Sequence, residues 1–308
     1  MSLAKQSGLL TPTGIFSSYQ SIRSQLPAPI HMPGSTNVID DLSELESQYD
    51  VFVFDAYGVL NIGDTAVPGA VERVRSLQAQ GKPVFVLTNG ASLTQRENVE
   101  KFTELGYDVE ADQIVSSRAA LLAHLPRFPE VKRWGVIMPR SGNMDELPEG
   151  SVGPGHRLFF DADGFMFLNA LEWDTDWHQH WASHLRETPR PILLGNPDLT
   201  APYEDRYQLQ PGYFCLQIMP SDLQPWVYPF GKPFSGIFDL VKERIAATVS
   251  GQPKVLMVGD TLHTDILGGT HAGFDTALVT GFGAHKGMPL ETCYAESGIR
   301  PDWQMSGI

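Results

Sequence analysis

Three carboxylates in this sequence stand where they could hold a metal ion or attack a substrate. Asp55 ends the apolar run VFVFD, and Asp260 follows the apolar run VLMVG, with Asp265 five residues further on. Carboxylate oxygens are hard ligands of the kind that Mg²⁺ prefers, and an aspartate can also act as a nucleophile. The pattern therefore indicates metal-assisted chemistry in which an aspartate takes up a group from the substrate.

Groups that could hold an anion accompany these carboxylates. Lys232 lies between a glycine and a proline, Thr88 ends the apolar run VFVLT, and the turn 56–58 follows Asp55 directly. A lysine can neutralise a phosphoryl group, while a hydroxyl and the backbone amides of a turn can donate hydrogen bonds to its oxygens. Together these residues meet the requirements of phosphoryl transfer to Asp55.

A doubly wound sheet would bring these residues together. The segments 51–55, 84–87 and 255–258 are apolar runs typical of strands buried on both faces, and a helical pattern follows each of them. Alternating strands and helices favour an α/β fold with a Rossmann-like, doubly wound parallel sheet, which binds ligands at the carboxyl ends of its strands. We therefore expect the polar residues that follow these strands to lie at one edge of the sheet.

Composition divides the chain into an arm, a core and an insertion. Residues 1–38 are rich in Ser, Pro, Gly and Thr, and we expect them to form an N-terminal arm on the surface. Residues 39–126 and 227–308 carry the alternating pattern and form the predicted core domain. Between them, residues 127–226 contain apolar strands separated by Gly- and Pro-rich joints, which predicts an inserted α/β cap domain.

Four segments resemble the motifs of the haloacid dehalogenase-like hydrolase superfamily, in the order and strand context of that family. They are FDAYGVL at 54–60, VLTN at 86–89, GKP at 231–233 and MVGDTLHTD at 257–265. The long stretch between the second and third segments leaves room for a large cap domain. Gly63, the segment 68–70 and the segment 196–198 further resemble subfamily IIA, which includes nitrophenyl phosphatases and pyridoxal phosphatases.

The resemblance implies a metal centre around the nucleophile. Asp55 would be the nucleophile and a ligand of Mg²⁺, and the backbone carbonyl of Tyr57 would be another ligand. Asp260 would bind the Mg²⁺ ion, and Asp265 would help to organise its ligands.

The resemblance also implies which residues hold the substrate. Thr88 and Asn89 would bind the phosphoryl group, and Lys232 would pair with both the phosphate and the catalytic aspartate. Asn196 and Asp198 in the cap would contact the substrate. The expected function is that of a Mg²⁺-dependent, phosphatase-like hydrolase that acts on a small phosphorylated metabolite.

Tyr57 departs from the family pattern, because phosphatases of this superfamily usually have a second Asp at that position. That Asp protonates the leaving alkoxide and then activates water, and a positioned acid or base contributes about 10² to 10⁴ in rate. A tyrosine, with an ordinary pKa of about 10, is a poor base at neutral pH. Two alternatives follow: a catalytically impaired protein that binds and senses phosphorylated ligands, or a metal-independent 2-haloacid dehalogenase, since those enzymes have a similar Asp-Ala-Tyr-Gly motif.

Two further patterns have simpler interpretations. The segment 161–164 (DADG) matches a two-aspartate motif, but Asp-Gly between two apolar runs is a strong signal for a hairpin turn. His180 and His184 are four apart on a predicted helix, as zinc ligands can be, yet packing of that helix against the cap sheet explains them better. We expect neither pattern to form a site.

The composition limits the partners of the protein. Lys and Arg number 22 against 36 Asp and Glu, and the resulting net charge of −14 repels nucleic acid and anionic lipid. Cys215 and Cys293 form no C-x-x-C pair, and neither a secretory signal nor a run of about 18 apolar residues occurs. We therefore expect a cytoplasmic protein whose partner is a small phosphorylated metabolite, without nucleic acid or membrane, and leave a homodimer open.

Overall fold

The computed structural model describes residues 11–203 and 206–308, and the chain divides into two compact units. The first unit comprises residues up to Gln25, Asn89–Thr94 and Ser116–Gly231; the second comprises Leu26–Thr88, Gln95–Val115 and Lys232–Ile308. These limits differ by 5 to 13 residues from the predicted domain boundaries, and Asn89–Thr94, predicted in the core domain, falls in the first unit. The interpretation of the units as a core and a cap stays a prediction.

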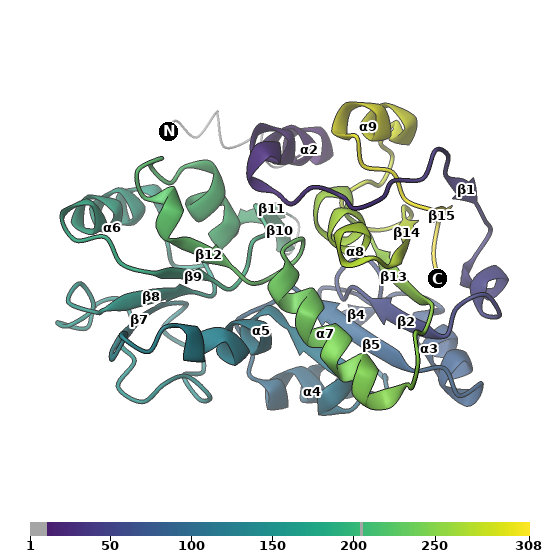
Figure 1. Ribbon diagram of the computed structural model, residues 1–308, viewed down its shortest axis with the longest axis horizontal. Coiled ribbons are helices and arrows are strands. Elements are labelled where there is room, and N and C mark those ends of the chain that lie inside the picture. Colours follow the sequence, from purple (N-terminus) through teal and green to yellow (C-terminus); the bar gives the residue numbers. More distant parts are fainter. Residues whose placement is uncertain (1–10, 204–205) are drawn as a thin grey trace. The chain divides into compact units, whose positions relative to one another are not determined.

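A seven-stranded sheet forms the centre of the second unit, with β2 between β13 and β5 (Figure 1). Its order is β1 (Asn37–Val38), β15 (Trp303–Met305), β14 (Asp275–Val279), β13 (Val255–Gly259), β2 (Val51–Phe54), β5 (Val84–Thr88) and β6 (Ile114–Ser116). The pairings from β1 through to β5 are all parallel. The predicted Rossmann-like α/β fold is confirmed.

Helices cover both faces of this sheet, which explains why β2 is apolar throughout and fully buried. They are α3 (Ala70–Ala79), α4 (Gln95–Glu104), α7 (Ser235–Thr248), α8 (Leu267–Ala272) and α9 (Leu290–Ser297). Val74 and Leu77 of α3 pack in one cluster with Phe52 and Phe54 of β2. Short 3₁₀ turns at Leu42–Leu45 and Ala111–Gln113 and the strand pair β3 (Asn61–Ile62) and β4 (Thr65–Ala66) complete the unit.

The first unit has a parallel sheet of its own. Its order is β12 (Val227–Pro229), β9 (Ile192–Leu194), β8 (Gly164–Phe167) and β7 (Trp134–Ile137). Helix α6 (Thr175–Glu187) packs on it through Trp181, whose ring meets the rings of Phe165 and Phe167 edge-on at 5.3 and 6.1 Å. The remaining elements are α2 (Pro12–Ser21), α5 (Ser117–His124), β10 (Thr200–Tyr203), β11 (Arg206–Leu209), 3₁₀ turns at Arg23–Gln25, Leu125–Arg127 and Gln224–Trp226, and a π-helical turn at Tyr213–Gln217.

Part of the predicted N-terminal arm is a helix with a buried face. In α2, Ile15, Phe16 and Tyr19 are buried, and the Tyr19 hydroxyl accepts a hydrogen bond from the backbone N–H of Leu199. Thr11 caps the helix by accepting from the N–H of Gly14. The composition of residues 1–38, rich in Ser, Pro, Gly and Thr, concealed this helix although Ile15, Phe16 and Tyr19 stand at helical spacing.

The hairpin predicted around residues 161–164 is wrong. Strand β8 begins at Gly164 and pairs in parallel with β7, while the residues just before it form turns. The carboxylate of Asp163 accepts hydrogen bonds from the N–H groups of Lys132 and Arg133, at 3.1 and 2.8 Å. The aspartate therefore fixes the loop that precedes β7, a role that the Asp-Gly pair alone did not reveal.

The other interpretation, that the helix carrying His180 and His184 packs against the sheet, agrees with the structure, since α6 packs on it through Trp181. His180 and His184 each pack against Phe160, with ring centroids 5.0 Å apart, and the metal-binding group found among the described residues contains neither. Cys215 and Cys293 are both buried free thiols. Over the described part of the chain, no helix combines the length and the apolar character needed to cross a bilayer.

Candidate active site

Polar residues gather at the carboxyl ends of three neighbouring strands of the second unit. Asp55 follows β2, Thr88 ends β5, and Asp260 follows β13. Because the strands are parallel and adjacent, these residues lie along one edge of the sheet, as the sequence predicted. The β2 backbone fixes the first of them, since the N–H of Asp55 donates to the carbonyl of Val258 at 2.8 Å.

Asp55, Asp260 and Asp265 form one acidic cluster in which a carboxylate oxygen of each lies within 4.8 Å of the others. Lys232 joins it from the segment that precedes α7. Its Nζ lies 2.6 Å from Oδ1 of Asp55 and 2.7 Å from Oδ1 of Asp265, and the lysine is almost fully buried. Four residues from three distant parts of the sequence thus meet in one place.

Local contacts hold two of these carboxylates in fixed orientations. Asp265 lies in a π-helical turn (Leu262–Ile266), and its Oδ2 accepts a hydrogen bond from the N–H of Thr261. Asp260 accepts from the hydroxyl of Thr261 at 2.7 Å and from the N–H of Ala284 at 2.9 Å. The cluster is therefore pre-organised by its own backbone turns.

Two glycines make the close approach to Asp260 possible. A Cβ on Gly58 would lie 2.5 Å from Oδ2 of Asp260, and a Cβ on Gly283 would lie 1.8 Å from the same atom. Both residues also have positive φ angles, of 79° each, which side-chain-bearing residues rarely adopt. These positions therefore require glycine on two independent grounds.

The charge of the cluster is not balanced within the protein. Burial, and next the Asp265 charge, raise the pKa of Asp55 well above its ordinary value, while Lys232 opposes this. Burial and Asp265 likewise raise the pKa of Asp260 to about 7. Burial lowers the pKa of Lys232, but the carboxylates of Asp265 and Asp55 outweigh it and the net change is upward. One lysine faces three carboxylates, so a further cation would stabilise the cluster.

The donor chemistry suits a magnesium ion. Mg²⁺ binds oxygen ligands and is often held by one or two carboxylates plus substrate phosphate. Asp55 and Asp260 supply such carboxylates, while Asp265 accepts hydrogen bonds from Lys232 and from the N–H of Thr261. The residues present therefore fit the ion, with Asp265 in a supporting position.

Tyr57 and Thr88 are two further predicted site residues that belong to the second unit. Tyr57 is half-buried and forms a single β-bridge with Asn61, just before the left-handed Gly58. Thr88 is half-buried at the last position of β5. The tyrosine thus stands two residues after the aspartate that follows the central strand.

The predicted residues Asn89, Asn196 and Asp198 meet in the first unit. The amide of Asn89 donates to Oδ1 of Asp198 at 2.8 Å, and its oxygen accepts from the hydroxyl of Ser117 at 3.2 Å. Asn196 accepts from the N–H of Asp198 at 3.0 Å and donates to the side chain of Gln210 at 3.2 Å. The segment that follows Thr88 is therefore bound directly to the Asn-Pro-Asp turn after β9.

Sequence reasoning missed several members of these networks. Ser117 and Gln210 carry no motif, and only their neighbours in space give them a role. Ala284 and His285 contact Asp260 through a backbone N–H and a ring nitrogen, at 2.9 and 3.0 Å. The glycine-rich segment 281–287 was the one available signal for this second pair, because glycines mark places where the backbone comes close to other atoms.

Comparisons with known proteins agree with this arrangement. A family model described as haloacid dehalogenase-like hydrolase matches residues 52–149, and a second, described as HAD-hydrolase-like, matches residues 229–305. Human glycerol-3-phosphate phosphatase is 29% identical, over 86% of this chain and 90% of its own. The 4-nitrophenylphosphatase of Schizosaccharomyces pombe is 23% identical, over 87% and 95% of the two chains.

A solved structure shares the fold. A haloacid dehalogenase superfamily protein of Cytophaga hutchinsonii, described as a possible sugar phosphatase, superposes with a TM-score of 0.75 at 24% identity, covering 89% of this chain and 98% of its own. The first family match contains Asp55 and Thr88, and the second contains Lys232, Asp260 and Asp265. From its motifs, its sheet and these relatives, this chain belongs to the haloacid dehalogenase-like hydrolase superfamily, in the subfamily that includes the nitrophenyl phosphatases.

Proposed function

We propose that this protein is a Mg²⁺-dependent phosphatase that hydrolyses a small phosphorylated metabolite through Asp55. The observation that carries the proposal is the buried cluster in which the carboxyl groups of Asp55, Asp260 and Asp265 gather around one lysine, Lys232. The relatives support it, since human glycerol-3-phosphate phosphatase and the yeast 4-nitrophenylphosphatase are both named for small phosphate esters.

In this mechanism a carboxylate oxygen of Asp55 attacks the phosphorus atom of the ester. The bond between phosphorus and the ester oxygen breaks, and the ester oxygen takes a proton from solvent water or, for an acidic alcohol, leaves as its anion. Water then attacks the phosphorus of the aspartyl-phosphate, the bond to Asp55 breaks, and inorganic phosphate is released. Lys232, already 2.6 Å from Asp55, would hold the carboxylate in place and pair with the phosphoryl oxygens.

The remaining roles follow from position. Asp55, Asp260 and the backbone carbonyl of Tyr57 would hold the Mg²⁺ ion, and Asp265 would fix Lys232 and the surrounding turn. When bound, the ion neutralises charge that develops on the phosphoryl group. We assign the phosphoryl oxygens to Thr88 and Asn89, and contacts with the rest of the substrate to Asn196 and Asp198. Two buried free thiols support a reducing, cytoplasmic location.

The acidic cluster argues against the two alternatives. A metal-independent dehalogenase has no need of three clustered carboxylates that favour an added cation. A protein that only senses phosphorylated ligands would not need a lysine held between Asp55 and Asp265 at 2.6 and 2.7 Å. Both alternatives remain outcomes of the test.

A panel of phosphate esters, assayed for phosphate release with Mg²⁺ and with a chelator, tests the proposal. We expect Mg²⁺-dependent release from at least one small ester and its loss in Asp55→Asn. The matched control is Asp161→Asn, because Asp161 opens the DADG segment of the first unit and is exposed. Release that survives chelation would exclude the metal-assisted mechanism, and halide release from 2-haloacids without Mg²⁺ would support the dehalogenase instead. Ligand-induced thermal stabilisation without any turnover would support the sensor.

A further inference from the structure

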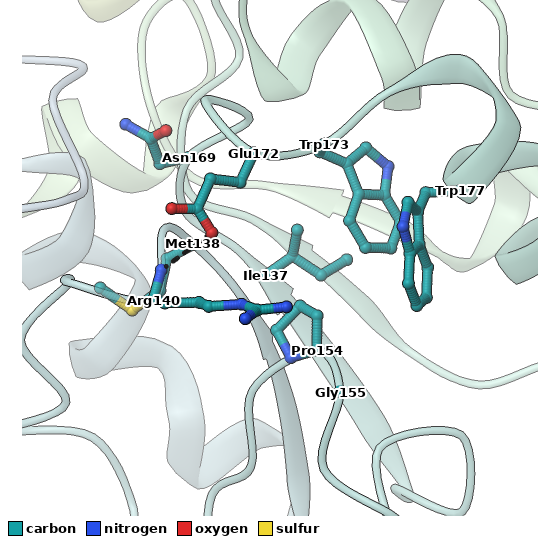
Figure 2. A pocket seen from close by; sticks show the side chains of 9 residues that line it. All are labelled: Ile137, Met138, Arg140, Pro154, Gly155, Asn169, Glu172, Trp173 and Trp177. Atoms are coloured by element: carbon teal, nitrogen blue, oxygen red, sulfur yellow. Dashed lines mark hydrogen bonds between the residues drawn. The ribbon is translucent and has the colours of Figure 1, made fainter.

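A small pocket in the first unit lies outside the proposed catalytic machinery. Figure 2 shows it at the ends of β7 and β8, and its cavity volume is about 70 Å³. Its lining residues are Ile137, Met138, Arg140, Pro154, Gly155, Asn169, Glu172, Trp173 and Trp177. The volume is more than twice the roughly 30 Å³ that a water molecule occupies in the liquid, so the pocket can hold a small organic group.

Buried contacts hold the walls of this pocket in place. Trp173 is buried, with 7% of its surface exposed. Both the nitrogen and the oxygen of the Asn169 side chain form hydrogen bonds. Its nitrogen donates to the hydroxyl of Ser92 at 2.7 Å, and its oxygen accepts from the N–H of Leu171 at 2.7 Å. Such fixed walls lower the entropic cost of binding a ligand.

The loop that carries Arg140 is anchored by a second arginine. Arg118 of α5 is 1% exposed, and its guanidinium donates to the backbone carbonyls of Asn143 and Asp145. The same group donates to the carbonyl of Ser92 at 3.3 Å and lies 3.4 Å from the carboxylate of Glu146. Arg118 thereby ties the loop after β7 to the residue that also holds Asn169.

Two opposite charges face this pocket without neutralising each other. The carboxylate of Glu172 accepts a hydrogen bond from the backbone N–H of Arg140 at 3.2 Å, as the dashed line in Figure 2 marks. The Arg140 guanidinium extends past Ile137 toward Pro154, away from that carboxylate (Figure 2). Among the described residues, neither Arg140 nor Glu172 takes part in an ion pair. One cation and one anion are thus available at a single pocket.

We propose that this pocket binds a small zwitterion, of the chemical class of a free α-amino acid. The carboxylate of such a ligand would meet the planar guanidinium of Arg140, which suits two parallel hydrogen bonds. Its ammonium group would meet the carboxylate of Glu172, which accepts charge-assisted hydrogen bonds. A short side chain would lie against Ile137 and fill the remaining volume.

This inference does not rest on the proposed function. All the residues that line the pocket belong to the first unit, whereas Asp55, Lys232, Asp260 and Asp265 belong to the second. The pocket could therefore bind its ligand in a protein whether or not Asp55 is catalytically active.

Isothermal titration of the full-length protein at low ionic strength tests this proposal with three probes of similar size. L-Alanine carries both charges, propionate carries the carboxylate alone, and ethylamine carries the ammonium alone. We expect saturable binding of L-alanine and at least roughly tenfold weaker binding of the two single-charge probes. Equal binding of L-alanine and propionate, or no saturable binding of L-alanine, would overturn it.

Variants of the full chain locate the binding. Arg140→Gln and Glu172→Gln each remove one charge and should each weaken L-alanine binding by roughly tenfold. Both residues are exposed, so circular dichroism should show unchanged folding. The matched control is Arg157→Gln, an exposed arginine of the loop between β7 and β8 that does not line the pocket, and it should bind L-alanine like the original protein. Equal weakening by Arg157→Gln would show non-specific attraction and overturn the proposal.

Discussion

The chemistry of this protein depends at the residue scale on how one lysine and three aspartates share a buried space. Lys232 contacts two of the three carboxylates directly, and Asp260 is held by a hydroxyl and a backbone N–H instead. The lysine therefore orients Asp55 but leaves negative charge for an added cation. The sequence predicts that Tyr57 stands in place of the second aspartate of the family motif, so we expect it to be the most informative single position.

The first prediction concerns the substitution Tyr57→Asp. If a missing acid limits hydrolysis, the new carboxylate should raise kcat/KM by at most the roughly 10² to 10⁴ that acid–base catalysis supplies. The gain should be larger for an alkyl phosphate than for 4-nitrophenyl phosphate, because nitrophenolate leaves without a proton. The measurement is kcat/KM for both esters with both proteins.

Tyr57→Asn serves as the matched control, because it shortens the side chain without adding a carboxylate. It should show no gain on either ester. A folded Tyr57→Asp protein that binds Mg²⁺ and gains nothing would mean that the missing acid is not what limits the reaction.

The sequence predicted the members of the acidic cluster and Lys232 because each adjoins a strong local pattern. Asp55 and Asp260 end apolar strands, and Lys232 has a glycine and a proline beside it. Ser117, Gln210 and Ala284 have no such pattern, since they act through a hydroxyl, an amide and a backbone N–H that any polar loop could offer. Their roles depend on contacts between distant segments, which local sequence does not encode.

At the scale of elements, the strands were easier to predict than the connections between them. The apolar runs of β2, β5 and β13 predict buried strands, because only a strand covered on both faces buries every side chain. The supposed hairpin at 161–164 failed because turn residues also occur before a parallel strand, where Asp163 holds the backbone of another loop. Helix α2 was missed because the Ser-, Pro- and Gly-rich composition around it outweighed the helical spacing of Ile15, Phe16 and Tyr19.

Helix α6 gives a prediction about pH. His178 is buried beside Trp181 and Phe214, neither of its ring nitrogens has a hydrogen-bond partner among the described residues, and burial lowers its pKa to about 4. The folded protein therefore keeps this histidine neutral where an unfolded chain, with a pKa of about 6.5, takes up a proton. The free energy of unfolding of the protein should therefore fall as the pH drops from 6.5 toward 4, by up to about 3 kcal/mol.

Urea unfolding of the protein and of His178→Leu across this pH range measures the effect. The free energy of unfolding of His178→Leu relative to the original protein should rise as the pH falls from 7 to 4.5, because leucine takes up no proton. The control is His180→Leu, at an exposed position of the same helix, which should show a constant difference. A constant difference for His178→Leu as well would contradict the account of α6.

At the scale of the whole molecule, the net charge of −14 and the buried acidic cluster both favour bound cations, but in different ways. Surface charge is screened by any salt, whereas the cluster needs a small ion that its oxygens can surround. A ligand that binds the folded state alone stabilises it by about 2.7 kcal/mol at a hundredfold excess over its Kd. Magnesium should therefore raise the stability of the folded chain beyond the effect of an equal ionic strength of NaCl.

The substitution Asp260→Asn separates these two effects. It should abolish most of the Mg²⁺-dependent increase in Tm, and it should raise the Tm measured in a chelator, because it removes one of three mutually repelling carboxylates. Asp161→Asn removes the same amount of negative charge at an exposed site, so Mg²⁺ should raise its Tm as much as that of the original protein. Equal Mg²⁺ responses in Asp260→Asn and the original protein would place the ion elsewhere.

The most direct test of the central claim is whether Asp55 becomes phosphorylated. The protein is mixed with Mg²⁺ and 4-nitrophenyl phosphate, quenched in acid within the first turnover and digested, and the peptide that contains Asp55 is weighed by mass spectrometry. Tyr57 is a poor base for the second step, so the aspartyl-phosphate should accumulate, and this peptide should carry one phosphoryl group that is absent in Asp55→Asn and in the chelator. Phosphate release by Asp55→Asn at the original rate, with no phosphorylated peptide in either protein, would contradict the account.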